Sequence, residues 1–142
     1  MPENTTHKFA VILSKKIEPG RALNAASHMI AALVANASPD MRNQMLFLNY
    51  EDANGGLHPT SGLSLVVLKA DNSNKIRTAR AAVIEAHLPF TDFLESMTQD
   101  SYVEQMARTK TLTEEALEYW GLAVFGPKEA IDPITRKFSL WI

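Results

Sequence analysis

The chain has 142 residues, 46% of them hydrophobic and 21% charged, which is long and apolar enough to bury one core without metals or disulfides. It has no cysteine, which excludes a disulfide framework, thiol catalysis and metal sites with Cys ligands. Its net charge of −2 provides no global field that would attract nucleic acid.

No apolar run approaches the roughly 20 residues that a membrane helix needs. The N-terminal residues MPENTTHK lack the basic and apolar regions of a signal peptide. We therefore expect a cytoplasmic protein that makes no membrane contact and folds as a single domain over residues 1–142.

The first half of the chain predicts two strands around a helix. Residues 8–14, KFAVILS, form a continuous apolar run that is typical of a buried strand. Pro19 and Gly20 end it, and helical spacing from 21 to 37 predicts a helix with an apolar stripe. Residues 45–50 read as a strand, and the turn-rich segment EDANGGLHPTSG after it predicts a mobile surface loop.

The second half predicts alternating strands and helices. The expected elements are a buried strand at 63–69, a helix from 72, a strand within 88–98, a helix opened by Ser101 and Glu104, a core strand at 122–126 and an edge strand at 138–142. A turn is expected at Asp132 and Pro133. This order predicts an α/β fold with three layers, in which helices flank a mixed β-sheet.

A polar stripe is predicted on the first helix. Arg21, Asn24 and His28 are spaced i, i+3 and i+7, which puts them on one side of the helix, opposite Leu23, Ile30 and Leu33. A helix N-terminus favours an anion, and an arginine adds a bidentate donor for carboxylate or phosphate. The pattern predicts a site for a small anionic ligand; the alternative is a solvated helix face.

Lys15 and Lys16 close the first strand, where ligands tend to bind in open α/β sheets. They extend the predicted anion site, although a solvated strand end would also explain them. Lys75, Arg77 and Arg80 could enlarge the basic patch, but they are not interleaved with aromatic residues, as a nucleic-acid surface would require.

Two carboxylates, Asp92 and Glu95, are expected to face the same site. A His28 imidazole beside Asp92 would be a general base that activates water; an exposed acid pair at a strand end is the alternative. The other histidines show no metal-ligand spacing, and P-loop and G-x-S-x-G patterns are absent, so no metal or cofactor is expected.

The chain ends in the apolar segment FSLWI, with Trp141 next to the C-terminus. An open strand edge with a large aromatic side chain must be covered, which predicts a homodimer. The alternative is that Trp141 packs back under a helix. Trp120 lies in an apolar strand and is expected to belong to the core or to an interface.

Two motifs carry a resemblance to a known family. The sequence E-P-G-R at 18–21, followed by a small-residue helix with S-H-M at 27–29, resembles the opening of the type II peptidyl-tRNA hydrolases. The segment LAVFGPKEAIDPITRKFSLWI resembles their closing pattern. The form E-P-G-R-A-L-N together with F-T-D is similar to an uncharacterised bacterial family of unknown function that shares this fold.

The resemblance implies a type II peptidyl-tRNA hydrolase-like fold and a set of site residues. It places the family's lysine on Arg21, its histidine on His28, its aspartate on Asp92 and its threonine on Ser96, or on Thr98 if the register slips. It implies catalytic roles for His28, Asp92 and Ser96. Together with the polar stripe of the helix and the end of the first strand, it gives five candidate ligand-binding residues: Lys15, Lys16, Arg21, Asn24 and Thr98.

The segment D-F-L-E-S at 92–96 departs from the family's D-A-G-R-T. It removes an arginine and places Glu95 where a phosphate backbone would need positive charge, so tRNA is not the expected partner. Two functions follow: a module that binds a small anionic ligand or a partner, which we favour, and a hydrolase of an ester or amide bond, such as a peptidyl-tRNA hydrolase.

Overall fold

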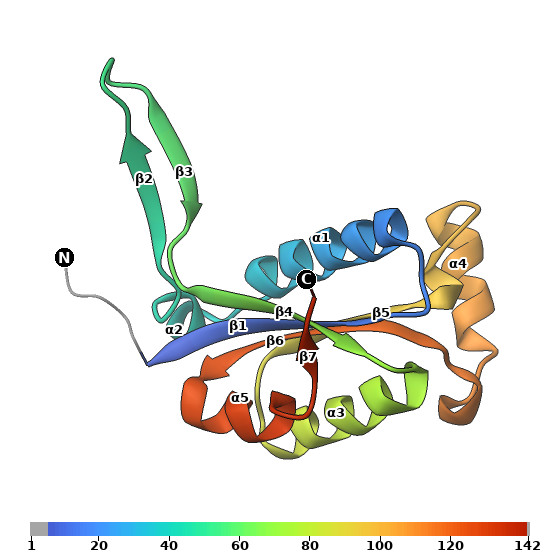
Figure 1. Ribbon diagram of the computed structural model, residues 1–142. Helices are drawn as coiled ribbons and strands as arrows, with labels where there is room; N and C mark the ends of the chain where they lie inside the picture. The colour runs from blue at the N-terminus through green and yellow to red at the C-terminus, as the bar shows by residue number, and fades with distance from the viewer. Residues whose placement is uncertain (1–5, 142) are drawn as a thin grey trace.

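The computed structural model describes residues 6–141 (Figure 1). Its centre is a five-stranded sheet with the strand order β5-β6-β1-β4-β7. The strands are β1 (His7–Ser14), β4 (Ser64–Ala70), β5 (Phe90–Leu94), β6 (Tyr119–Pro127) and β7 (Ser139–Leu140). Strands β1 and β4 are parallel, and the other neighbouring pairs are antiparallel. No helix in the described range is long and apolar enough to cross a membrane.

Helices cover both faces of this sheet, as the sequence predicts (Figure 1). Helix α1 (Pro19–Ala35) packs on one face, and α3 (Ser73–Glu85) and α5 (Lys128–Thr135) pack on the other. Strand β1 lies between the two cores and is buried from Phe9 to Ser14. This is a mixed α/β architecture with a mixed sheet between two helical layers.

The buried stripe of α1 differs from the predicted one. The helix buries Ala22, Ala25, Met29 and Leu33, whereas Leu23 is 68% exposed and Ile30 is half-buried. Leu23 follows the buried Ala22 by one residue, which turns its side chain about 100° away from the sheet. The alanines of the true stripe let the helix lie close to the strands.

A hairpin replaces the predicted mobile loop. After the short helix α2 (Pro39–Arg42), strands β2 (Phe47–Glu51) and β3 (Leu57–Ser61) pair antiparallel and project away from the sheet (Figure 1). The Asp52 carboxylate accepts the backbone N–H groups of Asn54 and Gly56, each at 2.9 Å. Gly55 has a φ of 84°, which glycine adopts without strain. The turn residues therefore close a hairpin.

The remaining helical segments are η1 (Glu95–Met97), α4 (Tyr102–Lys110) and η2 (Glu114–Ala116). The Ser101 hydroxyl caps α4 by accepting the Glu104 N–H, which confirms the predicted helix start. The turn expected at Asp132 and Pro133 is wrong, because both residues lie inside α5. Ile131, fully buried against the sheet, anchors that helix although Pro133 contributes no N–H.

Strand β7 covers the edge of β4, and the Trp141 N–H donates to the Val67 carbonyl at 2.9 Å. The Trp141 side chain is half-buried against the core beneath α1. The alternative, that Trp141 packs back under a helix, is thus confirmed. The expectation of an exposed Trp141, which supported a homodimer, is wrong. The last residue of the FSLWI segment, Ile142, lies outside the described residues.

Candidate functional site

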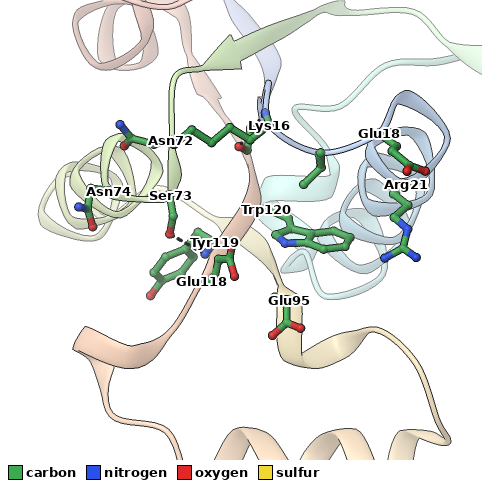
Figure 2. Close-up of a pocket in the computed structure, with 12 residues that line it drawn as sticks. Lys16, Glu18, Arg21, Asn72, Ser73, Asn74, Glu95, Glu118, Tyr119 and Trp120 are labelled. Atoms are coloured by element: carbon green, nitrogen blue, oxygen red, sulfur yellow. Dashed lines mark hydrogen bonds between the residues drawn. The ribbon is translucent and has the colours of Figure 1, made fainter.

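A cavity of about 570 Å³ lies where the parallel strands β1 and β4 end (Figure 2). Helix α1 leaves β1 toward one face of the sheet, and α3 leaves β4 toward the other, so the two helix N-termini flank the cavity. Such a crevice is where ligands bind in open α/β sheets. Its walls come from both strand ends, both helix starts, η1 and the start of β6: Ser14, Lys16, Ile17, Glu18, Arg21, Asn72, Ser73, Asn74, Glu95, Glu118, Tyr119 and Trp120.

The start of α1 leaves polar backbone groups open. Pro19 occupies the first turn, and Glu18 at the N-cap makes no side-chain capping bond. The first bond of the helical ladder runs from the Ala22 N–H to the Glu18 carbonyl. The N–H groups of Gly20 and Arg21 come before this first bond. They therefore have no partner within the helix and form its N-terminal end, which carries a partial positive charge.

Arg21 borders two cavities. Its guanidinium carbon lies 5.9 Å from the centroid of the Trp120 ring, and both residues also line a second cavity of about 390 Å³. Arg21 is exposed and makes no ion pair within residues 6–141. Figure 2 shows it beside Glu18 at the start of α1, with the Trp120 ring on the cavity side.

The second cavity lies between α1, the end of β5 and the segment before α4. Its walls are mostly polar at the rim and apolar below: Gly20, Arg21, Asn24, His28, Phe93, Met97, Thr98, Gln99, Gln105 and Trp120. The His28 ring stacks on Phe93 with 5.9 Å between centroids. Arg21, Asn24, His28 and Thr98 of the predicted site therefore come together here.

The two predicted lysines separate. The Lys15 ammonium pairs with the Asp71 carboxylate at 3.0 Å, and this hydrogen bond lowers the pKa of Asp71. Lys16 lines the first cavity and extends toward Asn72 (Figure 2). Lys15 thus contributes to a surface ion pair, and Lys16 is the lysine that a ligand in the cavity would meet.

Asp92 lies on the opposite face of the sheet from His28, so the expectation that Arg21, His28 and Asp92 share one cleft is wrong. Side chains alternate along a strand, and Phe93 packs under α1 with His28. The Asp92 carboxylate instead accepts a hydrogen bond from Arg80 Nε of α3 at 2.7 Å.

Arg77 and Arg80 do not extend the predicted basic patch, because carboxylates neutralise both of them. Both guanidinium groups pair with Glu114, and Arg77 additionally donates to the Glu114 and Leu117 carbonyls. The Tyr119 hydroxyl donates to the same carboxylate at 2.7 Å. Burial and this hydrogen bond raise the pKa of Tyr119 to about 12. The cluster ties η2 to α3 and β6.

The two hydroxyl candidates have different surroundings. Ser96 is buried, and its hydroxyl lies 2.7 Å from the Thr109 hydroxyl of α4, which directs it away from the cavities. Thr98 lines the second cavity, and its hydroxyl donates to the Glu95 carbonyl at 2.6 Å. Of the two positions that the resemblance allows for the family's threonine, Thr98 lines the second cavity and Ser96 does not.

Some residues that line the two cavities carry no signal of this position in the sequence. Trp120 is buried in the core at 7% exposure, as the sequence predicts, and its ring also lines both cavities, which no sequence signal indicates. Glu18 and Glu118 join Glu95 in the first cavity, where they oppose the two cations. Gln105 lies one helical turn from the Ser101 cap, and no motif marks it. The described part of the chain contains no group of three or more potential metal ligands.

The fold and the groove that the two cavities form on either side of Arg21 define an α/β domain with a candidate small-molecule site at the carboxyl edge of its parallel strands. The chain belongs to the family described as Protein of unknown function (DUF2000), which matches residues 7–142. It is also similar to the solved structure of Atu0240, a protein of unknown function from Agrobacterium tumefaciens strain C58. The two are 20% identical with a TM-score of 0.78, over 96% of this chain and 98% of the other, which shows a shared fold. No match was found among curated proteins.

Proposed function

We propose that this protein binds a small anionic ligand in the groove at the start of α1, with Arg21 as the principal contact. The observation that carries the proposal is the position of Arg21 on the shared border of two cavities, with no ion pair in residues 6–141. A guanidinium group binds carboxylate or phosphate through two parallel hydrogen bonds. The open N–H groups of Gly20 and Arg21 favour the same charge.

Other arginines of the chain support this interpretation by contrast. Arg77, Arg80 and Arg108 are each held by a carboxylate and by further contacts. Arg21 lies over the Trp120 ring and makes no ion pair in residues 6–141.

The charges around the groove favour a small ligand over tRNA. Glu18, Glu95 and Glu118 line the first cavity together with Lys16 and Arg21, and their negative charges would repel a phosphate backbone. A single anionic group can reach Arg21 without passing across the three carboxylates, because the second cavity has no carboxylate in its walls.

Hydrolysis of an ester or amide bond, such as that of peptidyl-tRNA, is less well supported. The pair of His28 and Asp92 that would activate water is divided by the sheet. A type II peptidyl-tRNA hydrolase-like fold remains part of our proposal and rests on the E-P-G-R and I-D-P-I-T motifs. A cytoplasmic location and a homodimer also remain predictions.

The proposal is tested by titrating the full chain with acetate and with inorganic phosphate while recording backbone amide NMR spectra. Binding at the groove would shift the amides of Gly20, Arg21 and Thr98, and Arg21→Ala would remove these shifts. Arg136→Ala is the matched control, because Arg136 is an exposed arginine at the end of α5. Shifts that are absent, or unchanged in Arg21→Ala, would refute the proposal.

A further inference from the structure

The second cavity combines an apolar floor with a polar rim. Phe93 and Trp120 are 8% and 7% exposed, and the half-buried Met97 lies with them in the same core. Arg21 lies over the Trp120 ring, and His28 stacks on the Phe93 ring. The cationic and imidazole groups therefore stand directly above apolar surface, an arrangement typical of sites that bury the body of a ligand and fix one polar end.

The distribution of carboxylates indicates in which direction the body of a ligand extends from Arg21. On one side, the first cavity contains Glu18, Glu95 and Glu118. On the other side, the second cavity contains no carboxylate in its walls and offers about 390 Å³. An anion that approaches Arg21 from the second cavity therefore avoids repulsion by these carboxylates. The surface next to it there is apolar.

The outer wall of this cavity is held in place before any ligand binds. Gln99 and Asp100 have φ values of 60° and 65°, in the left-handed region that non-glycine residues seldom adopt. Arg108 Nη2 donates to the carbonyls of Ser96, Thr98 and Gln99, and Gln105 Nε2 donates to the Gln99 carbonyl at 2.9 Å. A wall fixed by α4 loses little conformational freedom on binding, which favours affinity.

We propose that the ligand of the groove is a monocarboxylate that carries an apolar group. Its carboxylate binds Arg21, and its apolar group packs on Phe93, Met97 and Trp120 in the second cavity. This inference rests on the proposed function, since it assumes that Arg21 binds the anion. It adds the chemical class of the rest of the molecule.

The experiment is isothermal titration of the full chain with saturated monocarboxylates of increasing length, acetate, butanoate and hexanoate, beside inorganic phosphate. Each methylene that becomes fully buried should tighten binding about fourfold. We expect the affinity to rise along the series. Acetate and phosphate should bind weakly, and their binding should depend on Arg21.

Met97→Gln tests the location of the apolar group, because it keeps the length of the side chain and makes its end polar. It should remove the gain with chain length, so that hexanoate binds no more tightly than acetate to the same variant. Met106→Gln is the matched control, since Met106 is 67% exposed on α4 and does not line the cavity. If Met97→Gln fails to fold, the wild-type series still decides whether length matters.

The outcomes separate the two proposals. Arg21-dependent binding of acetate with no gain for butanoate or hexanoate would overturn this inference and leave the proposed function standing. A gain with length that persists in a folded Met97→Gln variant would also overturn it. No binding of any carboxylate or of phosphate would refute both.

Discussion

Arg80 Nε donates to the Asp92 carboxylate at 2.7 Å, on the face of the sheet that α3 covers. The side chains of Arg80 and Asp92 are only 27% and 16% exposed. The same guanidinium group lies 5.3 Å from the ring centroid of Phe90, which packs on this core. Asp92 therefore stabilises the packing of α3 on β5 and stands apart from the groove at α1.

Replacing Asp92 with asparagine tests this structural role. Asp92→Asn removes the charge that partners a largely buried guanidinium, and the free energy of unfolding should fall by about 1–3 kcal/mol. Urea denaturation at neutral pH measures the change. Asp71→Asn breaks the exposed pair with Lys15 and should cost no more than about 1 kcal/mol. An Asp92→Asn variant with unchanged stability and impaired hexanoate binding would return Asp92 to the binding site.

Tyr119 makes stability depend on alkaline pH. Its pKa in the folded chain is raised to about 12, chiefly by burial and then by the hydrogen bond to Glu114, from an ordinary value near 10. Because the unfolded chain releases this proton more readily, the contribution is fully present below about pH 10 and is lost as the pH rises toward 12.

Tyr119→Phe provides the comparison. Urea denaturation across this alkaline range should show a fall in stability for the wild-type chain that is smaller in Tyr119→Phe. Absorbance of the tyrosinate ion should show a phenol that titrates late in the wild type and is missing from the variant. A wild type and a variant with the same pH profile would show that Tyr119 is not responsible.

His28 distinguishes ligand binding from catalysis. The ring stacks on Phe93 and has no carboxylate partner within the described chain, so we expect it to contribute affinity only. His28→Ala should weaken hexanoate binding. A peptidyl-tRNA hydrolysis assay should detect no activity that depends on this residue. A rate that falls by about 10²–10⁴ in His28→Ala, with little change in affinity, would identify a general base and reverse our choice of function.

The hairpin gives the homodimer prediction its remaining support. Phe47 and Leu57 are 50% and 59% exposed on a two-stranded arm that projects from the sheet. An isolated hairpin is marginally stable in water, so an apolar arm gains from being covered. Sedimentation equilibrium should show a dimer that Leu57→Ser weakens. A wild type that is monomeric at high micromolar concentration would contradict the prediction.

The order of strands and helices in the sheet could be predicted because their patterns are long and regular. The buried run of β1, the helical spacing of α1 and the Ser101 cap each depend on neighbours in sequence. The hairpin was missed because β3 is exposed along its whole length and contains a proline. A strand without a buried face has no alternating pattern to detect, and the turn residues from Asp52 onward by themselves indicate only a loop.

The arrangement of the candidate site could be predicted where it depends on one helix, and could not where it depends on which face of a strand a side chain occupies. Arg21, Asn24 and His28 follow helical spacing, and the structure brings them to one cavity. Asp92 was assigned by resemblance, although a shift of one residue along β5 changes the face of the sheet. No local sequence pattern indicates that Trp120 lines the cavities either. Its contact with Arg21 depends on where α1 begins relative to the start of β6.

The contact between Arg21 and the anion is best measured through the dissociation constant of hexanoate in Arg21→Ala. A charge-assisted hydrogen bond contributes about 1.5–3 kcal/mol, so we expect hexanoate binding to weaken about ten- to a hundredfold. Melting should change little, because Arg21 is exposed, and Arg136→Ala should retain the wild-type affinity. A folded Arg21→Ala variant that binds hexanoate as tightly as the wild type would show that Arg21 does not bind the anion.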